Sequence, residues 1–519
     1  MRNNLVVLVN PGHDDEIPEK IALSYGAKYR KIRREDPPIS IINLGGFIRH
    51  HGYEVIILDT HIEPIYKTRL KELIKEEPLI IGFSVILGKF TKNAITLTRM
   101  IREINGDIPV VWGGKLVSLA KEIILEQIDV DFLILGDGEF PLLNLLDSLK
   151  NNKNYRNIPG IGYKENGETI ININTSQVEN LDTIYVSKDF GWDLIKPHIN
   201  VRQTPYFINL YTSRGCKFNC AFCYLKDIKQ YEAKYRFRQR SAGNIIREID
   251  YLRNTYGINV VTFGDDDFLS NVSELVPVFD YLRKRNIYIE HIWTNVSHLR
   301  PETIELLTGI CQTVCYSIET VSPRLQKILN KVISPERVIE VNKQLRKVGI
   351  NTVHNFLFGI PTETAEETKA NIDLLKKLKE INPHMRANTY ILSPIPDTPI
   401  FEFAKALAGV DIEWDMEDLA NFHFRYMGQA ASKFRPYLKP DDNLFYETVS
   451  ELTNELFTEL NTNPTEEQLR KIQNDKRLRY VFGDVNDINK PKDKDRKYIL
   501  DLVLEVMDNG LPMPKIEPF

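Results

Sequence analysis

The feature that most constrains the fold of this chain is an alternation of short apolar runs with helical patterns. Leu5–Val9 is a continuous apolar run that ends at Asn10-Pro11-Gly12, as a buried parallel strand does where a loop begins. Similar runs lie at 54–59, 79–84, 109–114 and 131–136, with helical patterns between them, for example over 39–51 and 91–105. The pattern predicts an α/β fold that opens with a Rossmann-like, doubly wound parallel sheet over residues 1–150.

Glycine and polar residues gather where these runs end. Ligands of such sheets bind beyond the carboxyl ends of the strands, and glycine lets a backbone come close to a ligand. For any one glycine, a tight turn is the simpler interpretation. The residues concerned are Asn10, Asp59, Ser84, Gly113, Gly114, Gly136 and Glu139.

A second series of strand–helix units follows a joint. Residues 161–171 place two short runs around Asn166-Gly167, which predicts a hairpin, and 174–205 have the character of a linker. Six strand-like runs follow at 207–211, 259–263, 288–293, 313–318, 352–358 and 386–392. The tail, 401–519, shows helical patterns at 444–460, 465–480 and 498–509, and a solvated loop is expected at 490–497.

Three of the five cysteines fall within eight residues, at Cys216, Cys220 and Cys223. Three thiolates on one loop suit three irons of a [4Fe–4S] cluster, because soft sulfur ligands suit iron–sulfur sites. The fourth iron is then open to a chelating substrate. The alternative is a structural zinc site, which usually needs four ligands in paired spacings, and no second pair lies nearby.

Composition excludes several classes of protein. The formal charge is −4 and Lys and Arg are scattered among a similar number of acids, so we expect no nucleic-acid partner. No run approaches the roughly 20 apolar residues of a membrane span, and the first apolar run is too short for a signal peptide. The clustered cysteines argue against a disulfide framework. We therefore expect a cytoplasmic protein.

The Cys-x3-Cys-x2-Cys spacing, with Phe222 before the last cysteine, resembles the radical SAM superfamily. The resemblance implies a partial (β/α)6 barrel over 206–400, reductive cleavage of S-adenosylmethionine (SAM) to a 5′-deoxyadenosyl radical, and an external electron donor such as flavodoxin or ferredoxin. Barrel chemistry lies at the carboxyl-terminal rim. The SAM contacts that the resemblance implies there are Phe222, Gly264, Asp265, Asp266, Asp267, Asn295, Ser317, Glu319, Gly359 and Pro361.

Several of these residues have simpler interpretations. The run Gly264–Asp267 also fits a Mg²⁺ site or a solvated turn, and Asn295 equally fits a helix cap. Cys311 and Cys315 are expected in the core. Tyr390 is predicted to face the substrate as a candidate catalytic residue.

The first 150 residues resemble the cobalamin-binding domain of the cobalamin-dependent branch of this superfamily. The matching segments are Asp36–Ser40, His51–Val55, Gly82–Ser84, Val110–Gly114 and Gly136–Glu139. The resemblance implies a corrinoid with its nucleotide tail against the sheet and its lower face over the loop 85–88. The implied contacts are Asn10, Ser84, Val85, Leu87, Gly113, Gly114, Gly136 and Glu139.

Two sequence features expected in related proteins are absent from this region. The Asp-x-His-x-x-Gly signature of a cobalt-binding histidine is missing. The histidines of this region, His13, His50, His51 and His61, are each expected to be surface or capping residues. Residues 1–215 contain no cysteine, whereas methylthiotransferases of similar domain order carry a second cluster there.

Together these patterns predict a cobalamin-dependent radical SAM methyltransferase that uses [4Fe–4S], SAM and cobalamin. It would methylate an unactivated carbon or a phosphinate through a 5′-deoxyadenosyl radical and methylcobalamin. The alternative is a cyclisation, hydroxylation or rearrangement without methyl transfer, and a non-catalytic corrinoid or redox sensor is a third hypothesis. The substrate class stays open among small molecules, lipids and peptides. Residues 401–519 are expected to cover the barrel mouth.

Overall fold

The computed structural model describes residues 4–12, 37–63, 65–173, 178–196, 207–225, 237–411, 413–422, 431–457 and 466–483. They form two compact units, each assembled from separated stretches of chain. The first unit lies within Met1–Asn209, Asp227–Ile258 and Glu413–His423, and the second within Leu210–Lys226, Asn259–Ile412 and Phe424–Phe519. The predicted domain boundaries at 150, 205 and 400 stay a prediction. The features expected at 490–497 and 498–509 lie outside the described residues.

The first unit is built on a seven-stranded sheet in the order β2-β1-β3-β4-β5-β6-β7. Its strands are β1 (Leu5–Asn10), β2 (Glu54–Asp59), β3 (Ile80–Ser84), β4 (Val110–Gly113), β5 (Phe132–Ile134), β6 (Ile161–Glu165) and β7 (Glu168–Ile171). Every residue of β1 is buried, as its unbroken apolar sequence predicts for a central parallel strand. Strands β1 to β5 are parallel.

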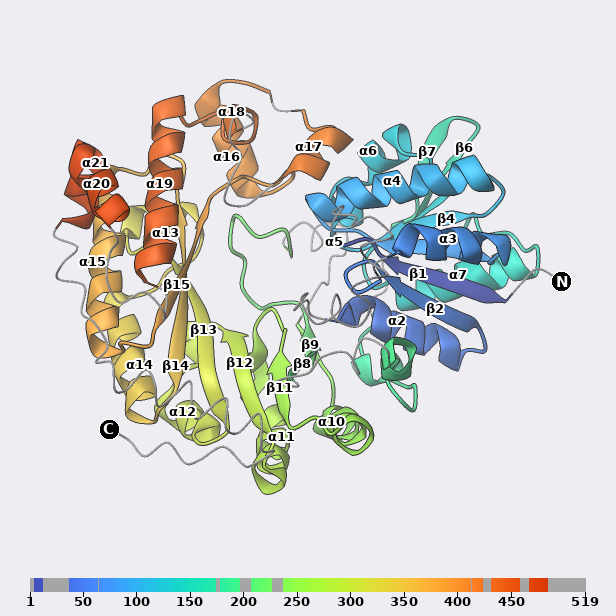
Figure 1. Cartoon of the computed structure of the whole chain (residues 1–519), viewed down its shortest axis with the longest axis horizontal. Coiled ribbons are helices and arrows are strands. Elements are labelled where there is room, and N and C mark those ends of the chain that lie inside the picture. Colours follow the sequence, from blue (N-terminus) through green and yellow to red (C-terminus); the bar gives the residue numbers. More distant parts are fainter. Residues whose placement is uncertain are drawn as a thin grey trace. The chain divides into compact units, whose positions relative to one another are not determined.

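The helices of this unit are α2 (Ile39–His50), α3 (Tyr66–Lys75), α4 (Lys89–Ile104), α5 (Lys115–Leu119), α6 (Lys121–Gln127), α7 (Glu139–Lys150), α10 (Ala242–Tyr256) and α17 (Met416–Asn421). Short elements are η1 (Leu181–Thr183), η2 (Trp192–Ile195) and β10 (Arg238–Gln239). Helix α2 contacts α7, and α3 contacts α4, so the two pairs cover opposite faces of the sheet (Figure 1). This arrangement confirms the predicted doubly wound fold.

The predicted hairpin extends this sheet. Strands β5, β6 and β7 pair antiparallel, so the sheet is parallel only over its first five strands. Asn166 and Gly167 take φ values of 52° and 84° in the turn. Left-handed backbone at both central residues is the geometry that Asn-Gly favours in tight hairpins.

The second unit contains a six-stranded sheet in the order β15-β14-β13-β12-β11-β8. Its strands are β8 (Phe207–Leu210), β11 (Val260–Phe263), β12 (Tyr288–Thr294), β13 (Cys311–Glu319), β14 (Asn351–Phe358) and β15 (Arg386–Ile391), and β9 (Ser213–Arg214) is a short strand after β8. Neighbours from β11 to β15 are parallel. All six predicted strands are therefore present.

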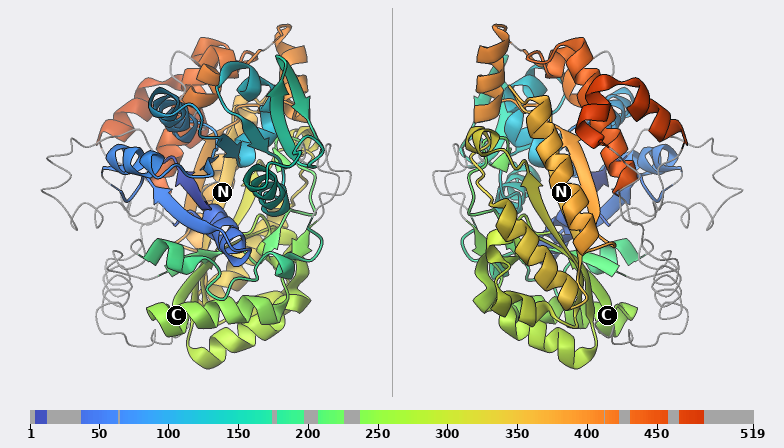
Figure 2. Two further views of the ribbon diagram at one scale, coloured as in Figure 1. Left: turned by 90° about the vertical axis from the view of Figure 1, so that its right-hand side faces the viewer. Right: turned by 90° about the vertical axis from the view of Figure 1, so that its left-hand side faces the viewer.

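The helices of the second unit pack around this sheet. They are α11 (Val272–Arg285), α12 (Pro301–Leu307), α13 (Pro323–Ile328), α14 (Pro335–Lys347), α15 (Ala365–Ile381), α16 (Pro399–Ala408), α18 (Ala431–Phe434), α19 (Pro440–Leu456), α20 (Glu466–Asn474) and α21 (Lys476–Phe482), with the short turns η3 (Phe268–Asn271) and η4 (Val296–His298). Helices α14 and α15 lie side by side outside β14 (Figure 2).

The predicted helix over 465–480 is interrupted in the structure. Asp475 separates α20 from α21, because its side chain accepts the backbone N–H groups of Arg477 and Leu478 and so caps the second helix. Across the part of the chain that the structure describes, no helix has both the length and the apolar character needed to cross a membrane.

Candidate functional site

The cysteine loop follows β8 at the carboxyl-terminal end of the second sheet. Cys216, Cys220 and Cys223 are all partly exposed and form no disulfide. Burial raises the pKa of Cys216 to about 11 and that of Cys223 to about 12, although the backbone N–H groups of Phe218 and Leu225 bond to their sulfurs. The thiols would therefore ionise only beside a positive charge, which a bound metal supplies.

The three cysteines differ from a single-ion site in what they would bind. Among the described residues, no group of three His, Cys, Asp or Glu side chains is arranged to hold one metal ion. A structural zinc ion needs its ligands around one centre, whereas a four-iron cluster gives each cysteine its own iron.

Backbone and side-chain contacts fix this loop. The N–H of Ala221 donates to Leu329 C=O at 2.8 Å, and its carbonyl accepts the Ile400 N–H at 3.2 Å. The Asn330 amide donates to Asn219 C=O at 2.7 Å. The loop is thus held by the segment after α13 and by the start of α16.

The three aspartates after β11 have different environments. Asp265 is 2% exposed, and its Oδ1 accepts the Thr212 N–H at 3.0 Å, the Thr212 hydroxyl at 2.9 Å and the Ser213 hydroxyl. Burial raises the pKa of Asp265 to about 6, even though these hydrogen bonds favour its charged form. Asp265 therefore ties the start of the cysteine loop to β11.

Asp267 is also turned inward. It accepts the Thr294 hydroxyl and the Asn295 N–H, both at 3.0 Å, and lies 3.0 Å from His298 Nε2. Burial opposes ionisation of Asp267, but hydrogen bonds from His298 and Ser270 outweigh it and lower its pKa. Asp267 thus fastens the loop after β11 to the end of β12.

Asp266 is the exposed member of the three. Its charge contributes to the raised pKa values of Cys216 and Cys223, which places its carboxylate near the cysteine loop. Of the four predicted SAM contacts in this run, Asp266 alone is exposed, and Gly264 is partly exposed. Asn295 caps η4, since its side chain accepts the Ser297 N–H at 3.0 Å.

The last residue of β13, Glu319, has a strained backbone conformation. Glu319 has φ 65°, a left-handed conformation that is costly for a residue with a side chain. Its Oε1 accepts Lys331 Nζ at 2.8 Å, and both side chains are largely buried. The pair joins the end of β13 to the segment that holds the cysteine loop.

Strand register places polar side chains side by side on the inner face of the sheet. Thr352 bonds to Asn342 of α14 and Thr389 to Ser450 of α19, so alternate residues of β14 and β15 face away from these helices. On that inner face, Ser317, Asn355 and Asn388 are opposite one another in register.

Asn355 carries an unusual acceptor within this row. Its amide nitrogen donates to the Ser317 hydroxyl at 3.1 Å. Among the described residues, its buried Oδ1 has no hydrogen-bond partner. Buried acceptors are rarely left unpaired without a ligand, water or functional reason.

Phe222 and Tyr390 share one apolar cluster. Both pack, partly buried, against side chains that lie near the ends of β14 and β15, namely Leu325, Leu329, Leu357, Ile360, Leu392 and Ile400. Pro361 is buried beside this cluster, and Gly359 takes φ 64° where β14 ends. Phe222 therefore belongs to the same rim as Tyr390 and the Gly359 segment.

The predicted cobalamin contacts of the first unit include residues at its topological switch point. Strand β1 lies between β2 and β3, so the strand order reverses there. Asn10 is the last residue of β1. Ser84 is the last residue of β3 and pairs in register with Gly113 of β4. The Asn10 amide, however, is buried and donates to Asp59 Oδ1 at 2.9 Å. Ser84 and Gly113 are the more accessible residues at this edge.

The loop after β3 fits an apolar ligand face. Ile86 is 39% exposed and Leu87 is partly exposed, whereas Val85 is buried. Gly114 has φ 104°, and a Cβ there would lie 2.7 Å from the Val85 carbonyl oxygen. Glycine is therefore required for this close approach. The exposed and partly exposed side chains of this loop, Ile86 and Leu87, are apolar and would fit a corrinoid packed against them.

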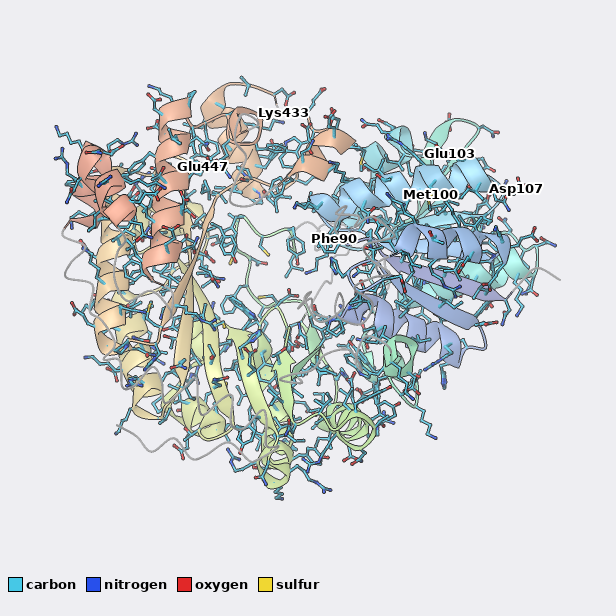
Figure 3. All side chains as sticks on the ribbon, viewed as in Figure 1. Phe90, Met100, Glu103, Asp107, Lys433 and Glu447 are labelled. Atoms are coloured by element: carbon cyan, nitrogen blue, oxygen red, sulfur yellow. The ribbon has the colours of Figure 1, made fainter. Side chains whose placement is uncertain are left out.

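One histidine expectation is wrong. His50 and His51 are exposed, but His61 is buried and packs edge-on against Phe90 in the first turn of α4, with ring centroids 5.4 Å apart. Phe90 is labelled in Figure 3. His13 lies outside the described residues. It is a core residue at the end of β2.

Two predicted cobalamin contacts, Gly136 and Glu139, lie in the segment after β5 and have different environments. Gly136 takes φ 69° in the turn, and Glu139 is buried at the start of α7. Their neighbour Asp137 forms a buried ion pair with Arg238 at 2.5 Å. Arg238 also donates to Val178 C=O at 2.8 Å, which fastens this turn to the linker.

Sequence reasoning missed the partners of these residues. Thr212, His298, Lys331, Asn355 and Arg238 carry no recognisable motif, and their roles arise only from folding. A single signal was present for Thr212, which directly precedes the cysteine loop. Cys311 and Cys315 are buried free thiols, in line with their expected core position.

Models of two known families match the chain. The model of the Radical SAM superfamily matches residues 210–375. The model of the B12 binding domain matches residues 30–146.

Curated relatives resemble most of the chain. An uncharacterised methyltransferase of Pyrococcus horikoshii is 28% identical over 383 residues, covering 73% of this chain and 80% of that protein. Cytidylyl-2-hydroxyethylphosphonate methyltransferase of Streptomyces wedmorensis is 22% identical over 427 residues, covering 69% of this chain and 79% of that protein.

A solved structure shows the same fold. The radical S-adenosylmethionine methyltransferase TsrM from Kitasatospora setae, determined with cobalamin and a [4Fe–4S] cluster bound, has a TM-score of 0.64 at 20% identity. The match covers 79% of this chain and 79% of that one.

Proposed function

Because the chain is a radical SAM protein that carries a B12-binding domain, we propose that it is a cobalamin-dependent radical SAM methyltransferase. Its acceptor would be an unactivated carbon or a phosphinate of a substrate held against the inner face of the second sheet. The observation that carries this proposal is the cysteine loop, which lies at the same strand ends as Asp266 and the Gly359 segment. Relatives named as methyltransferases support transfer of a methyl group.

The cysteine loop would hold the cluster. Cys216, Cys220 and Cys223 would each bind one iron, and the contacts of Ala221 and Asn330 would keep the loop in place when the cluster is absent. When bound, the cluster supplies the electron that cleaves SAM, and the corrinoid carries the methyl group.

The rim of the second sheet would position SAM. Asp266 would accept the ammonium of its methionyl end, because an exposed carboxylate binds a cation without the cost of burying both charges. Ser317 and Asn355 offer hydroxyl and amide groups for the ribose. The adenine would lie near the end of β14, where Gly359 is buried, and Tyr390 would face the substrate.

The first unit would hold the corrinoid at its switch point. Ser84, Gly113 and Gly114 line the strand ends where a nucleotide tail would bind, and Ile86 and Leu87 offer an apolar surface to the lower face. We also propose a cytoplasmic enzyme reduced by flavodoxin or ferredoxin, since clustered cysteines that form no disulfide are typical of a reducing compartment.

The test is anaerobic reconstitution with iron, sulfide and hydroxocobalamin, followed by metal analysis and assay of 5′-deoxyadenosine. The wild-type protein should hold about four irons and one corrinoid. Cys220→Ala should lose iron and SAM cleavage but keep the corrinoid, and the matched control Cys311→Ala should keep all three. Reductive SAM cleavage by Cys220→Ala would refute the assignment. SAM cleavage by the wild type without methylated product would favour the cyclisation, hydroxylation or rearrangement alternative.

A further inference from the structure

Both peptide groups that flank Cys220 are bound by one segment from outside the cysteine loop. The carbonyl of Asn219, in the peptide group before Cys220, accepts the Asn330 side-chain amide at 2.7 Å. The N–H of Ala221, in the peptide group after Cys220, donates to Leu329 C=O at 2.8 Å. Each residue has only two soft backbone dihedrals. Holding both peptide groups therefore fixes the direction in which the Cys220 side chain leaves the backbone.

The asparagine stands where a helix end favours glycine. Asn330 follows α13 with φ 50°. Its N–H donates to Lys327 C=O at 3.2 Å, and the Lys331 N–H donates to Gln326 C=O at 2.9 Å. These are the bonds of a Schellman motif, in which glycine usually takes the left-handed position because it has no Cβ. Closing the helix therefore does not require an asparagine, and what Asn330 adds is the amide that reaches the cysteine loop.

A buried glutamine fastens this helix end to β13. Gln326 is 4% exposed, and its amide donates to Thr320 C=O at 3.0 Å and to Ile333 C=O at 2.8 Å. Thr320 directly follows Glu319, the last residue of β13. Lys331 adds its ion pair with Glu319 at 2.8 Å. The segment that holds Cys220 is therefore itself held at the end of a strand that carries predicted SAM contacts.

We propose that Asn330 is a positioning residue for Cys220, which orients this thiolate toward its iron and holds it in place relative to the end of β13. The proposal rests on the proposed function, because it takes Cys220 as a cluster ligand. A ligand that is already held in its binding direction loses less freedom when it binds. The contact from Asn330 should therefore slow the loss of iron from the cluster.

The experiment compares Asn330→Gly with the matched control Asn286→Gly. Asn286 is exposed and ends α11 with the same motif, with φ 52°. Its N–H donates to Arg283 C=O at 3.4 Å, and the Ile287 N–H donates to Leu282 C=O at 2.9 Å. Glycine adopts the left-handed conformation freely, so both variants should keep their helix ends and unfold thermally like the wild type.

Two measurements on the reconstituted proteins report on the cluster. The first is the rate of iron release to an excess of chelator, and the second is the electron paramagnetic resonance spectrum of the dithionite-reduced cluster. Asn330→Gly should lose iron about fivefold faster than the wild type, as expected when one hydrogen bond is lost. Its spectrum should differ, because the Cys220 thiolate would meet its iron from another direction. Asn286→Gly should match the wild type in both.

Each result bears on the proposal. Wild-type iron release and a wild-type spectrum in Asn330→Gly overturn it. Faster iron loss with an unchanged spectrum would indicate general loosening of the loop, and also overturns it. An equal effect of Asn286→Gly would assign the change to helix ends and overturn it likewise. A wild-type protein that binds no iron overturns the proposed function as well, so iron binding by the wild type separates the two failures.

Discussion

Replacing Asp265 by Ala tests how much this buried aspartate contributes to the free energy of unfolding, a contribution that depends on pH. The substitution leaves three donors without their carboxylate, namely the Thr212 N–H and the hydroxyls of Thr212 and Ser213. An unsatisfied buried N–H costs about 1–3 kcal/mol, and each hydroxyl bond to a charged group is worth about 1.5 kcal/mol or more. The gross loss is therefore about 4–6 kcal/mol.

The burial of Asp265 offsets part of this loss at neutral pH. Its pKa is raised from 3.8 to about 6, so the folded protein binds more protons than the unfolded chain between these values. The contribution of Asp265 to stability therefore falls as the pH rises through this window, by about 2 kcal/mol between pH 4 and pH 7 and by about 3 kcal/mol over the whole shift. The alanine variant lacks this dependence.

We therefore expect Asp265→Ala to lower the free energy of unfolding of the second unit by about 1–3 kcal/mol at pH 7 and by about 2 kcal/mol more at pH 4. Urea dependence of hydrogen exchange in β11 and β12, measured on cluster-free protein, gives both values. Asp266→Ala is the control and should change them by less than about 0.5 kcal/mol. A loss that is equal at both pH values, or larger at pH 7, would refute the reasoning.

Two further predictions address the exposed aspartate and the first unit. Asp266→Asn should weaken SAM binding about tenfold, as expected for one charged hydrogen bond, without changing thermal stability. An unchanged dissociation constant would assign the ammonium to the backbone of 264–267 instead. Gly114→Ala should destabilise the first unit by about 3 kcal/mol and abolish corrinoid retention, because its Cβ would lie 2.7 Å from the Val85 carbonyl. Gly113→Ala has no contact closer than 3.6 Å and should cost far less in thermal unfolding.

The sequence predicted those parts of the molecule that depend on neighbouring residues. The alternation of apolar runs and helices predicted the sheet strands, because period and turn residues act locally. The loop with Cys216, Cys220 and Cys223 was recognised for the same reason, since its cysteines are close together in the chain. Asn166-Gly167 likewise specified its hairpin.

Local patterns also misled where a tertiary contact decided the outcome. His61 was expected at the surface but is buried against Phe90 of the following α/β unit. The helical pattern over 465–480 predicted one helix, but the side chain of Asp475 caps a second helix within it. In both cases the composition was compatible with either outcome.

Only the tertiary structure distinguished the three consecutive aspartates. Asp265 is held by Thr212, 53 residues earlier, and Asp267 by Thr294, 27 residues later, which leaves Asp266 exposed. Likewise, Asn330 reaches Asn219 across 111 residues. Residues of one type are equivalent in a sequence, and they acquire different charge states and roles only when strand order and register bring distant partners to them. The sequence therefore indicated the type of reaction and its cofactors, and the tertiary structure decided which side chains remain accessible to them.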